Sequence, residues 1–227
     1  MRKEYDLYGG KKIFMDDRFF KLTTDTVLLS SFVKADKSER GLDLGAGIGC
    51  LGILVSLKNG GVPVDGAEIV PGAAALAREN YGKCGAAGDI VCGDYEKLPK
   101  TRSYGFCVSN PPYFGTDDGK QNLSDEMRKA RHSQLRGLFE AADGALKEDG
   151  RLYFCIRPDR LGAALSLLSE TGFFARRVRY ARESAEHAPF LVMIEAARGK
   201  GETVTESPLI LRDENGYTEE YKRIYGL

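Results

Sequence analysis

The chain passes from apolar residues through glycines and back to apolar residues over Leu42-Asp43-Leu44-Gly45-Ala46-Gly47-Ile48-Gly49-Cys50-Leu51-Gly52. We expect a strand over residues 40–44 and a helix over residues 50–58, with the glycines forming the turn between them. Glycine adopts the backbone conformations that a sharp turn requires, and it lets the backbone approach a ligand closely. The stretch therefore predicts the first strand–turn–helix unit of an α/β fold, with a ligand-binding loop where the strand ends.

Short apolar strands continue to alternate with longer helical segments along the chain. This alternation predicts a Rossmann-like α/β fold, with a seven-stranded, mostly parallel sheet, helices on both faces and a C-terminal antiparallel strand pair. The further strands are expected over residues 63–69, 89–92, 104–109 and 151–156, followed by 173–181 and 190–197 as the closing pair. The further helices are expected over residues 71–81, 133–146 and 159–170.

No linker or repeat divides the chain, so we expect a single domain over residues 1–227. It would consist of an N-terminal segment (1–39), a core (40–198) and a C-terminal tail (199–227). The polar residues 114–132 predict a long loop within the core. Ser133 is expected to be the N-cap of the helix after that loop, and residues 147–150 to be the turn that ends this helix.

The composition excludes several classes of protein. Lys and Arg total 33, as do Asp and Glu, so the zero net charge excludes a polybasic nucleic-acid binder but not a local basic patch. No apolar run is long enough to span a bilayer, and no signal core follows the charged N-terminus. We therefore expect a cytoplasmic protein with no membrane partner. The 5 cysteines and 2 histidines lack metal-site spacing, which predicts reduced, mostly buried cysteines and no metal.

Acidic residues stand at the ends of the first three core strands. Asp43 precedes the glycines, where a carboxylate can pair with the amino group of a ligand. Glu68 follows about twenty residues later, where a carboxylate can accept both hydroxyls of a ribose. Asp94 would reach the amino group of an adenine in the same ligand. The spacing Gly47-x-Gly49-x-x-Gly52 also meets the dinucleotide fingerprint, so the loop alone leaves a nicotinamide- or flavin-dependent oxidoreductase open.

The tetrapeptide Asn110-Pro111-Pro112-Tyr113 follows the fourth strand, at the edge where open α/β sheets bind ligands. The Asn110 side-chain oxygen and the Pro111 carbonyl can each accept one N–H of a planar amino group. These bonds would position a nitrogen whose lone pair is otherwise delocalised, so that catalysis needs no general base. Tyr113 offers a face on which a flat base can stack, worth about 1–3 kcal/mol. The tetrapeptide therefore predicts chemistry at an amino or amide nitrogen.

These motifs together resemble those of the Rossmann-like methyltransferases that act on nitrogen and depend on S-adenosylmethionine (SAM). Within this class the chain resembles the tRNA adenine N6-methyltransferases that modify adenosine 37 of valine tRNA. The resemblance implies SAM as cofactor, the exocyclic N6 of an adenine as methyl acceptor, and tRNA as partner. The expected catalytic residues are Asn110, Pro111, Pro112 and Tyr113, and the expected SAM-binding residues are Thr24, Asp25, Asp43, Gly45, Gly47, Glu68, Asp94 and Asn110.

Three further stretches carry the resemblance to this family. Residues 18–29, which include Thr24 and Asp25, resemble the segment that closes over the cofactor. Ala130-Arg131-His132 resembles the tract after the catalytic motif, which implies that Arg131 and His132 bind the substrate together with Tyr113. The tail matches in Pro208-Leu209-Ile210, Tyr217-Thr218-Glu219-Glu220 and Ile224-Tyr225-Gly226.

A tRNA partner requires local positive charge, and alternative substrates have to be weighed. Protein glutamine N5-methylation suits the same motif, but enzymes of that kind usually carry a helical N-terminal domain, for which residues 1–39 leave no room. DNA adenine methylation also suits the motif, but no target-recognition domain is evident. An oxidoreductase would leave the Asn-Pro-Pro-Tyr tetrapeptide unexplained, and a non-catalytic RNA-binding module would require a degenerate cofactor pocket. The candidate RNA contacts are Lys11, Lys12, Arg18 and Lys21; Arg128, Lys129, Arg131 and Arg136; and Arg176, Arg177, Arg179 and Arg182.

Overall fold

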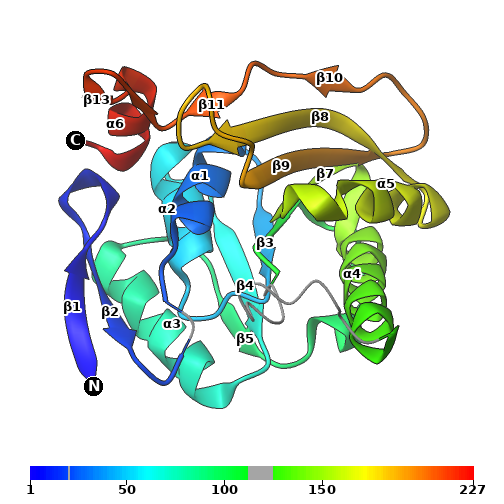
Figure 1. The fold of residues 1–227 in the computed structure, drawn as a ribbon. Helices are drawn as coiled ribbons and strands as arrows, with labels where there is room; N and C mark the ends of the chain where they lie inside the picture. Colours follow the sequence, from blue (N-terminus) through cyan, green and yellow to red (C-terminus); the bar gives the residue numbers. More distant parts are fainter. Residues whose placement is uncertain (20, 112–124) are drawn as a thin grey trace.

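A computed structural model of the chain describes residues 1–19, 21–111 and 125–227, with residues 125–132 described by their backbone alone. Its centre is a nine-stranded sheet in the order β10-β8-β9-β7-β6-β3-β4-β5, in which β11 also pairs with β8 (Figure 1). The predicted seven strands and the closing antiparallel pair are confirmed. They are β3 (Gly41–Leu44), β4 (Val64–Glu68), β5 (Ile90–Cys92), β6 (Tyr104–Ser109), β7 (Leu146–Ile156), β8 (Phe173–Arg182) and β9 (Leu191–Arg198).

The strand directions follow the predicted pattern. β3 to β7 pair in parallel, whereas β9 runs antiparallel to both of its neighbours, β7 and β8. Two pieces in the tail, β10 (Val204–Thr205) and β11 (Leu209–Ile210), extend the sheet by pairing in parallel with β8. Both were missed, because two residues are too few to show the alternation that marks a strand.

Helices cover both faces of the sheet (Figure 1). α1 (Thr24–Phe32), α2 (Cys50–Lys58) and α3 (Pro71–Cys84) lie on one side, and α4 (Asp125–Ala145) and α5 (Leu161–Glu170) on the other. Short 3-10 helices, η1 (Tyr8–Gly10), η2 (Tyr95–Lys97) and η3 (Pro158–Arg160), lie in the connections.

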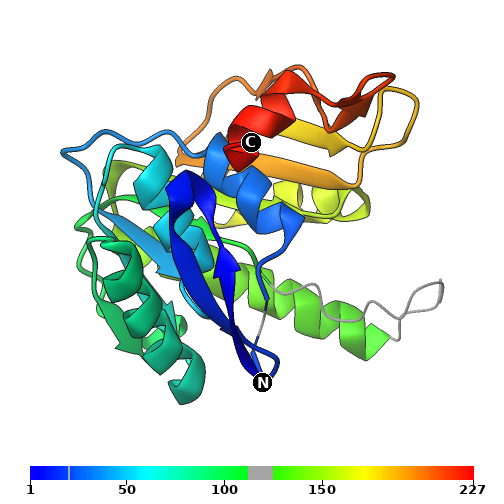
Figure 2. The same cartoon turned by 90° about the vertical axis from the view of Figure 1, so that its left-hand side faces the viewer.

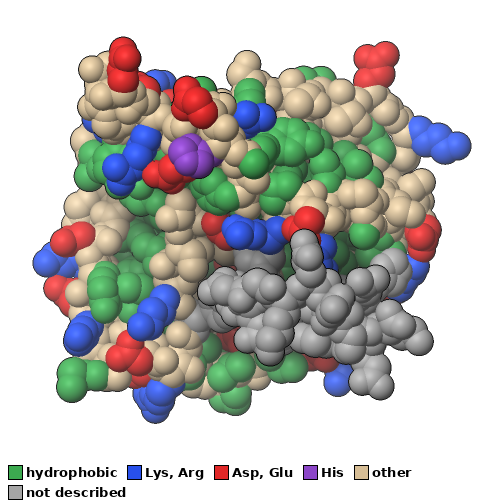
Figure 3. Space-filling view, in the orientation of Figure 1, with side chains coloured by type: hydrophobic (Ala, Val, Ile, Leu, Met, Phe, Trp, Pro, Cys, Tyr) green, Lys and Arg blue, Asp and Glu red, His purple; other side chains and the backbone are tan. Residues whose placement is uncertain are grey.

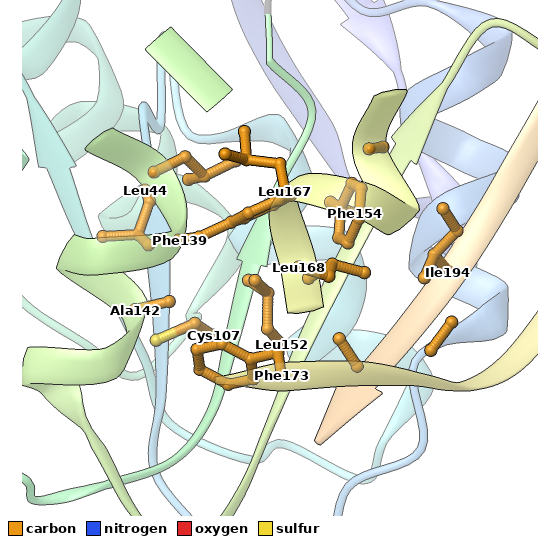
Figure 4. Close-up of a cluster of buried hydrophobic side chains, with 14 of the residues drawn as sticks. Leu44, Cys107, Phe139, Ala142, Leu152, Phe154, Leu167, Leu168, Phe173 and Ile194 are labelled. Carbon is orange, nitrogen blue, oxygen red and sulfur yellow. The ribbon is translucent and has the colours of Figure 1, made fainter. Parts of the chain in front are cut away.

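Alternation along the strands divides the core between the two faces. Leu44 and Cys107 face α4 and α5, where they join Phe139, Phe154 and Leu167 in one buried cluster (Figure 4). Phe106, Val108 and Tyr153 point to the opposite face and pack with residues of α1 and α2. Asp43 lies between Leu42 and Leu44 on β3, so its side chain points to the side of α2, where it accepts a hydrogen bond from the backbone of Gly52.

The structure corrects the expected loop over residues 114–132. Residues 112–124 lie outside the described residues, but α4 already begins at Asp125, so Ser133 lies inside the helix and is not its N-cap. Residues 125–132 are rich in good helix formers without apolar periodicity, which is why the pattern predicted a loop. Residues 147–150 belong to β7 rather than to a separate turn, although the pairing with β6 shifts register there, between Tyr104 and Phe106.

The N-terminal segment and the tail pack beside the α1–α3 side. The hairpin of β1 (Arg2–Asp6) and β2 (Lys12–Asp16) lies along α3 (Figure 2). The tail forms a second small hairpin, β12 (Arg212–Asp213) and β13 (Gly216–Tyr217), and ends in α6 (Glu219–Tyr225), which contacts α1. In the described part of the chain, none of the helices has the length and apolar character needed to cross a membrane.

Candidate active site

The candidate site lies at the carboxyl edge of the sheet, between β3 and β6. The chain leaves β3 toward β4 and β5 but leaves β6 toward β7, so the direction of winding reverses between these two neighbours. Loops on either side of such a reversal diverge and leave a crevice. A cavity of about 510 Å³ lies there, within the size range of small-molecule sites. Its lining brings together Asp43, Gly45, Gly47, Glu68, Asn110 and Pro111, as the sequence predicts.

The glycine loop after β3 forms one wall of the cavity. Gly45, Gly47 and Gly49 have φ angles of +84°, +57° and +87°, a left-handed conformation that strains other residues. The backbone N–H groups of Gly45 and Ala46 both donate to the Ala67 carbonyl at 3.0 Å. The loop is therefore fastened to the end of β4, and Gly45 and Gly47, which have no side chain, line the cavity with their backbone.

Asp43 is buried beneath this loop, and one of its two carboxyl oxygens has no partner among the described residues. Its side chain lines the cavity, and its Oδ2 accepts a hydrogen bond from the backbone N–H of Gly52 at 3.1 Å. Its Oδ1 is buried and has no partner in the described ranges. Burial raises the pKa of Asp43 to about 7. An unpaired buried acceptor is costly, so the site lacks one donor that a cationic ligand group can supply.

Glu68 connects the glycine loop with the loop after β4. Its Oε2 accepts from the backbone N–H of Gly47 at 2.7 Å, and its Oε1 accepts from that of Val70 at 2.8 Å. Each carboxylate oxygen can accept more than one hydrogen bond, so both can still receive ligand hydroxyls. The two backbone bonds fix the carboxylate at the cavity wall, where a ribose would have to lie if the predicted role holds.

Asn110 follows β6 directly and is held by side chains from two other elements. Its Nδ2 donates to Oγ1 of Thr26 in α1 at 3.0 Å, and its Oδ1 accepts from the Cys155 thiol of β7 at 3.2 Å. The preceding residue, Ser109, is buried and donates from its hydroxyl to the Leu44 carbonyl at 2.7 Å. The ends of β3 and β6 are thus joined, and Asn110 is brought to the cavity that Asp43 lines.

Three predicted cofactor residues lie near the cavity without belonging to its described lining. Asp94 is the N-cap of η2, where it accepts from the backbone N–H of Glu96 at 3.0 Å, and its neighbour Tyr95 faces the cavity instead. Thr24 is exposed and Asp25 half-buried in the first turn of α1, and burial raises the pKa of Asp25. The predicted roles of all three in cofactor binding stay predictions.

Other predicted residues cannot be placed as side chains. Pro112 and Tyr113 lie outside the described residues, and Arg131 and His132 belong to the part of α4 described by its backbone alone. Their catalytic and substrate-binding roles stay predictions. Within the described ranges, no group of three or more His, Cys, Asp or Glu side chains could hold a metal ion.

Some of the candidate RNA contacts form ion pairs within the fold, and others lie at the cavity. Arg177 is buried against Glu195 and Glu206, and Arg179 pairs with Glu220 at 2.8 Å, so these two arginines hold the fold together. Arg18 and Lys21 pair with acidic neighbours but also line the cavity, so the N-terminal run contributes cations at the site itself.

Sequence reasoning missed several residues of the site. Thr26 touches Asn110 across 84 positions of the chain, and Tyr95 lines the cavity beside the glycine loop. Phe19 and Val70 also lie in the wall, together with Gln134 of α4. The sequence indicates residues 18–29 as a segment, but only tertiary packing determines which of their side chains reaches the site.

The fold and the site geometry define a class: an α/β enzyme with a small-molecule pocket beside an asparagine that follows a strand. Residues 13–179 match the family model described as "Methyltransferase small domain". A curated relative from Dickeya chrysanthemi, tRNA1(Val) (adenine(37)-N6)-methyltransferase, is 31% identical over 86% of this chain and 81% of its own length. The chain belongs to the methyltransferase small domain family and, within these relatives, to the tRNA1(Val) (adenine(37)-N6)-methyltransferases.

A further relative carries the same name, and solved structures share the fold. A protein of the same name from Yersinia enterocolitica is 27% identical and covers 97% of this chain and 93% of its own length. The crystal structure of a predicted O-methyltransferase from Agrobacterium tumefaciens superposes with a TM-score of 0.72 at 18% identity, over 89% of this chain and 96% of that one. The crystal structure of TYW2 from M. jannaschii in complex with AdoMet superposes with a TM-score of 0.59 at 15% identity, over 87% of this chain and 86% of that one. The structural likeness concerns the fold, and the family match decides against an oxidoreductase.

Proposed function

We propose that this protein transfers the methyl group of SAM to N6 of adenine 37 in a valine tRNA. The observation that carries the proposal is that Asn110, an acceptor suited to an amino group, lines the same cavity as the unpaired Oδ1 of Asp43. One residue can hold the methyl acceptor while the other holds the donor. The names of the relatives give the same reaction and the same nucleotide.

The residues present fit SAM. The unpaired Asp43 Oδ1 can accept a hydrogen bond from the ammonium of its methionine part, and the free lone pairs of Glu68 can accept those of the ribose hydroxyls. Tyr95 and Val70 supply apolar and aromatic surface for an adenine. When bound, SAM supplies an electrophilic methyl group on a positively charged sulfur.

Asn110 and Pro111 act on the other reactant. The Asn110 Oδ1 and the Pro111 carbonyl oxygen can each accept one N–H of the adenine amino group. This pair of bonds directs the nitrogen lone pair toward the cofactor and favours its pyramidal form, so that the protein contributes positioning and electrostatic stabilisation. The proton can leave to solvent after methyl transfer, and no general base is required.

The charge distribution suits a small, local RNA contact. Lys and Arg side chains lie interspersed with acidic ones on the face shown in Figure 3, rather than in one broad basic patch. A base in an anticodon loop can be splayed into a pocket at lower cost than a base in a duplex. Arg18 and Lys21, at the wall of the cavity, are positioned to meet the phosphates beside such a base.

Mass spectrometry of nucleosides tests the proposal. The protein would be incubated with methyl-labelled SAM and an unmodified valine tRNA, and in parallel with the same tRNA carrying guanosine at position 37. Label in N6-methyladenosine with the first tRNA and none with the second is expected, and Asn110→Ala serves as the inactive control. Two further incubations supply a protein release factor or duplex DNA in place of tRNA, and label on a glutamine or on DNA, with none in the tRNA, would assign the same site to a different substrate.

A further inference from the structure

The hydroxyl of Thr26 connects the N-terminal segment to the proposed catalytic asparagine. Thr26 is 6% exposed, and its Oγ1 accepts a hydrogen bond from Asn110 Nδ2 at 3.0 Å. Its Oγ1 also lies 3.2 Å from Oγ1 of Thr23, the N-cap of α1, which accepts from the backbone N–H of Thr26 at 3.4 Å. The Thr26 hydroxyl can therefore give its own proton to Thr23 and keep its oxygen as an acceptor for the amide of Asn110.

The amide of Asn110 is contacted from both of its polar ends. Thr26 holds the nitrogen, and the Cys155 thiol, 3.2 Å from Oδ1, reaches the oxygen from β7. The last torsion of an asparagine is broad and roughly two-fold, so packing alone distinguishes poorly between the amide and its flipped form. Hydrogen bonds have to select which end faces the substrate, and here Thr26 and Cys155 make them.

The selection matters because the two ends of the amide act in opposite ways on an amino group. The oxygen accepts an N–H of the substrate, whereas a flipped amide would present its own N–H groups to the N–H groups of the substrate. Donation from Nδ2 to Thr26 also polarises the amide and makes Oδ1 a stronger acceptor, since linked hydrogen bonds reinforce one another. The Cys155 thiol is a weak donor, so Oδ1 retains capacity for the substrate.

We propose that Thr26 is a positioning residue for catalysis, which orients the Asn110 amide so that Oδ1 is presented to the methyl acceptor. The N-terminal segment then contributes to the chemistry itself, in addition to any covering of the cofactor. This inference rests on the proposed function for the role of Asn110, but the orientation of the amide is a property of the protein alone.

Two substitutions at Thr26 and one in the next turn test the kinetic consequence. Thr26→Val keeps the shape of the side chain and removes the hydroxyl, and we expect kcat to fall about tenfold, the effect of losing one hydrogen bond in the transition state. Thr26→Ser restores the hydroxyl and should restore kcat. Ser30→Ala is the matched control, since Ser30 is a buried hydroxyl of the same helix that donates to the Val27 carbonyl at 2.7 Å and does not touch Asn110.

The affinity for S-adenosylhomocysteine, measured by calorimetry, and the melting temperature separate positioning from a structural role. We expect Thr26→Val to keep both close to the wild-type values, and Ser30→Ala is the reference for losing a buried hydroxyl in α1. An unchanged kcat in Thr26→Val, or a Thr26→Ser variant as slow as Thr26→Val, would overturn the inference. If Thr26→Val does not fold, Thr26→Ala is measured in the same way.

Nuclear magnetic resonance gives a readout that needs no substrate. The side-chain NH₂ signals of Asn110 are identified by their loss in Asn110→Ala, and in the wild type we expect one Nδ2 proton to exchange slowly with water. This protection should disappear in Thr26→Val and persist in Ser30→Ala. Fast exchange in the wild type would overturn the inference even if tRNA is methylated. Conversely, if no tRNA is methylated, the proposed function fails while the protection of this proton still decides the orientation.

Discussion

In the proposed mechanism, two oxygen atoms define the chemistry of the site at the scale of single residues. Asp43 lies in β3 and Asn110 directly follows the neighbouring strand β6, and both residues line one cavity. Asn110 Oδ1 has only a thiol as its partner and Asp43 Oδ1 has none in the described part of the chain. Both therefore have the capacity to bind ligand groups, one an amino group that reacts and the other an ammonium that does not.

Replacing Asn110 should separate turnover from cofactor binding. In Asn110→Ala we expect turnover to fall by about 10²–10³, the usual cost of removing one preorganised electrostatic group. Affinity for S-adenosylhomocysteine should change little, because the asparagine acts on the methyl acceptor. Steady-state kinetics and calorimetry measure the two quantities. Asn59→Ala, which removes an asparagine that bonds Ala35 and Val55 away from the site, is the control. Loss of cofactor affinity equal to the loss of turnover would contradict the assigned role.

Asp43 should make cofactor affinity depend on pH. Its pKa of about 7 in the free protein means that below this pH the carboxyl is mostly protonated and cannot pair with an ammonium. Affinity for SAM should therefore rise between pH 6 and pH 7.5, and the rise should end where an α-amino group loses its own proton, at about 7.7–8.0. Calorimetry across this range measures the effect, and Asp43→Asn should bind weakly with a flatter profile.

The raised pKa of Asp43 also makes the stability of the fold depend on pH. Folding raises the pKa of Asp43 from 3.8 to about 7, so the neutral carboxyl favours the folded state. This contribution to the free energy of unfolding is complete below pH 3.8, the pKa in the unfolded chain, and is lost as the pH rises through about 7. Denaturant unfolding of wild type and Asp43→Asn should therefore differ in slope between pH 4 and pH 7. Parallel curves over that window would show that Asp43 is not the buried carboxyl described.

The sequence predicted the cavity-lining residues that lie in the glycine turn and at strand ends, and it missed those that reach the cavity through packing. Asp43, Gly45, Gly47, Glu68 and Asn110 all lie at ends of strands that share one edge, so the fold class alone brings them together. Thr26 and Tyr95 reach the cavity from α1 and η2, at positions that no spacing along the chain determines.

At the scale of elements, the packing of α2 on α3 depends on one glycine. A β-carbon on Gly52 would overlap the hydroxyl of Tyr81, which is buried and has no hydrogen-bond partner among the described residues. The backbone N–H of Gly52 also donates a hydrogen bond to Oδ2 of Asp43. The third glycine of the fingerprint therefore serves close helix packing and the orientation of a site carboxylate, and it needs no contact with a pyrophosphate.

Gly52→Ala should accordingly destabilise the protein, by about 1–3 kcal/mol as for other overpacked cores. Tyr81→Phe removes the hydroxyl that would clash, so the double variant should recover most of this loss in denaturant unfolding. Gly82→Ala is the matched control, because Gly82 is a helical glycine of α3 with open space around its Cα, and alanine there should be neutral or stabilising. No recovery in the double variant would refute the packing explanation.

The predicted bounds of helices and strands agree with the structure where the apolar pattern of the sequence is strong. The bounds of α2 and β6 agree with the predicted ranges, whereas α4 begins at Asp125 and β7 at Leu146, both earlier than expected. The first part of α4 is polar with good helix formers, and residues 147–149 near the start of β7 are polar and exposed, so neither shows the period that identifies its element.

At the scale of the whole molecule, a buried arginine connects the tail, the sheet and α1. Arg177 of β8 donates to Glu195 Oε2 at 2.8 Å, to Glu206 Oε1 at 3.0 Å and to the Phe32 carbonyl at 2.7 Å. These partners lie in β9, the tail and the end of α1. The run of arginines over residues 176–182, considered from sequence as an RNA contact, therefore includes the residue that joins the three parts.

Arg177→Ala should destabilise the protein by about 3–5 kcal/mol, because Glu195 would remain buried after losing its close, buried partner and would keep only the more distant, exposed Arg176. Its neighbour Arg176 is 59% exposed and lies 3.7 Å from the same carboxylate, so Arg176→Ala should change stability by less than about 1 kcal/mol. Urea unfolding measures both. A single transition seen by two probes would also support the prediction of one domain, which otherwise stays a prediction.

The central claim is that donor and acceptor of the methyl group meet between Asp43 and Asn110, and a crystal structure with S-adenosylhomocysteine tests it most directly. The amino group of the ligand should lie within hydrogen-bonding distance of Asp43 Oδ1, with its sulfur facing the amide of Asn110 across the cavity. An amino group bound elsewhere, or a sulfur that points away from Asn110, would contradict the claim.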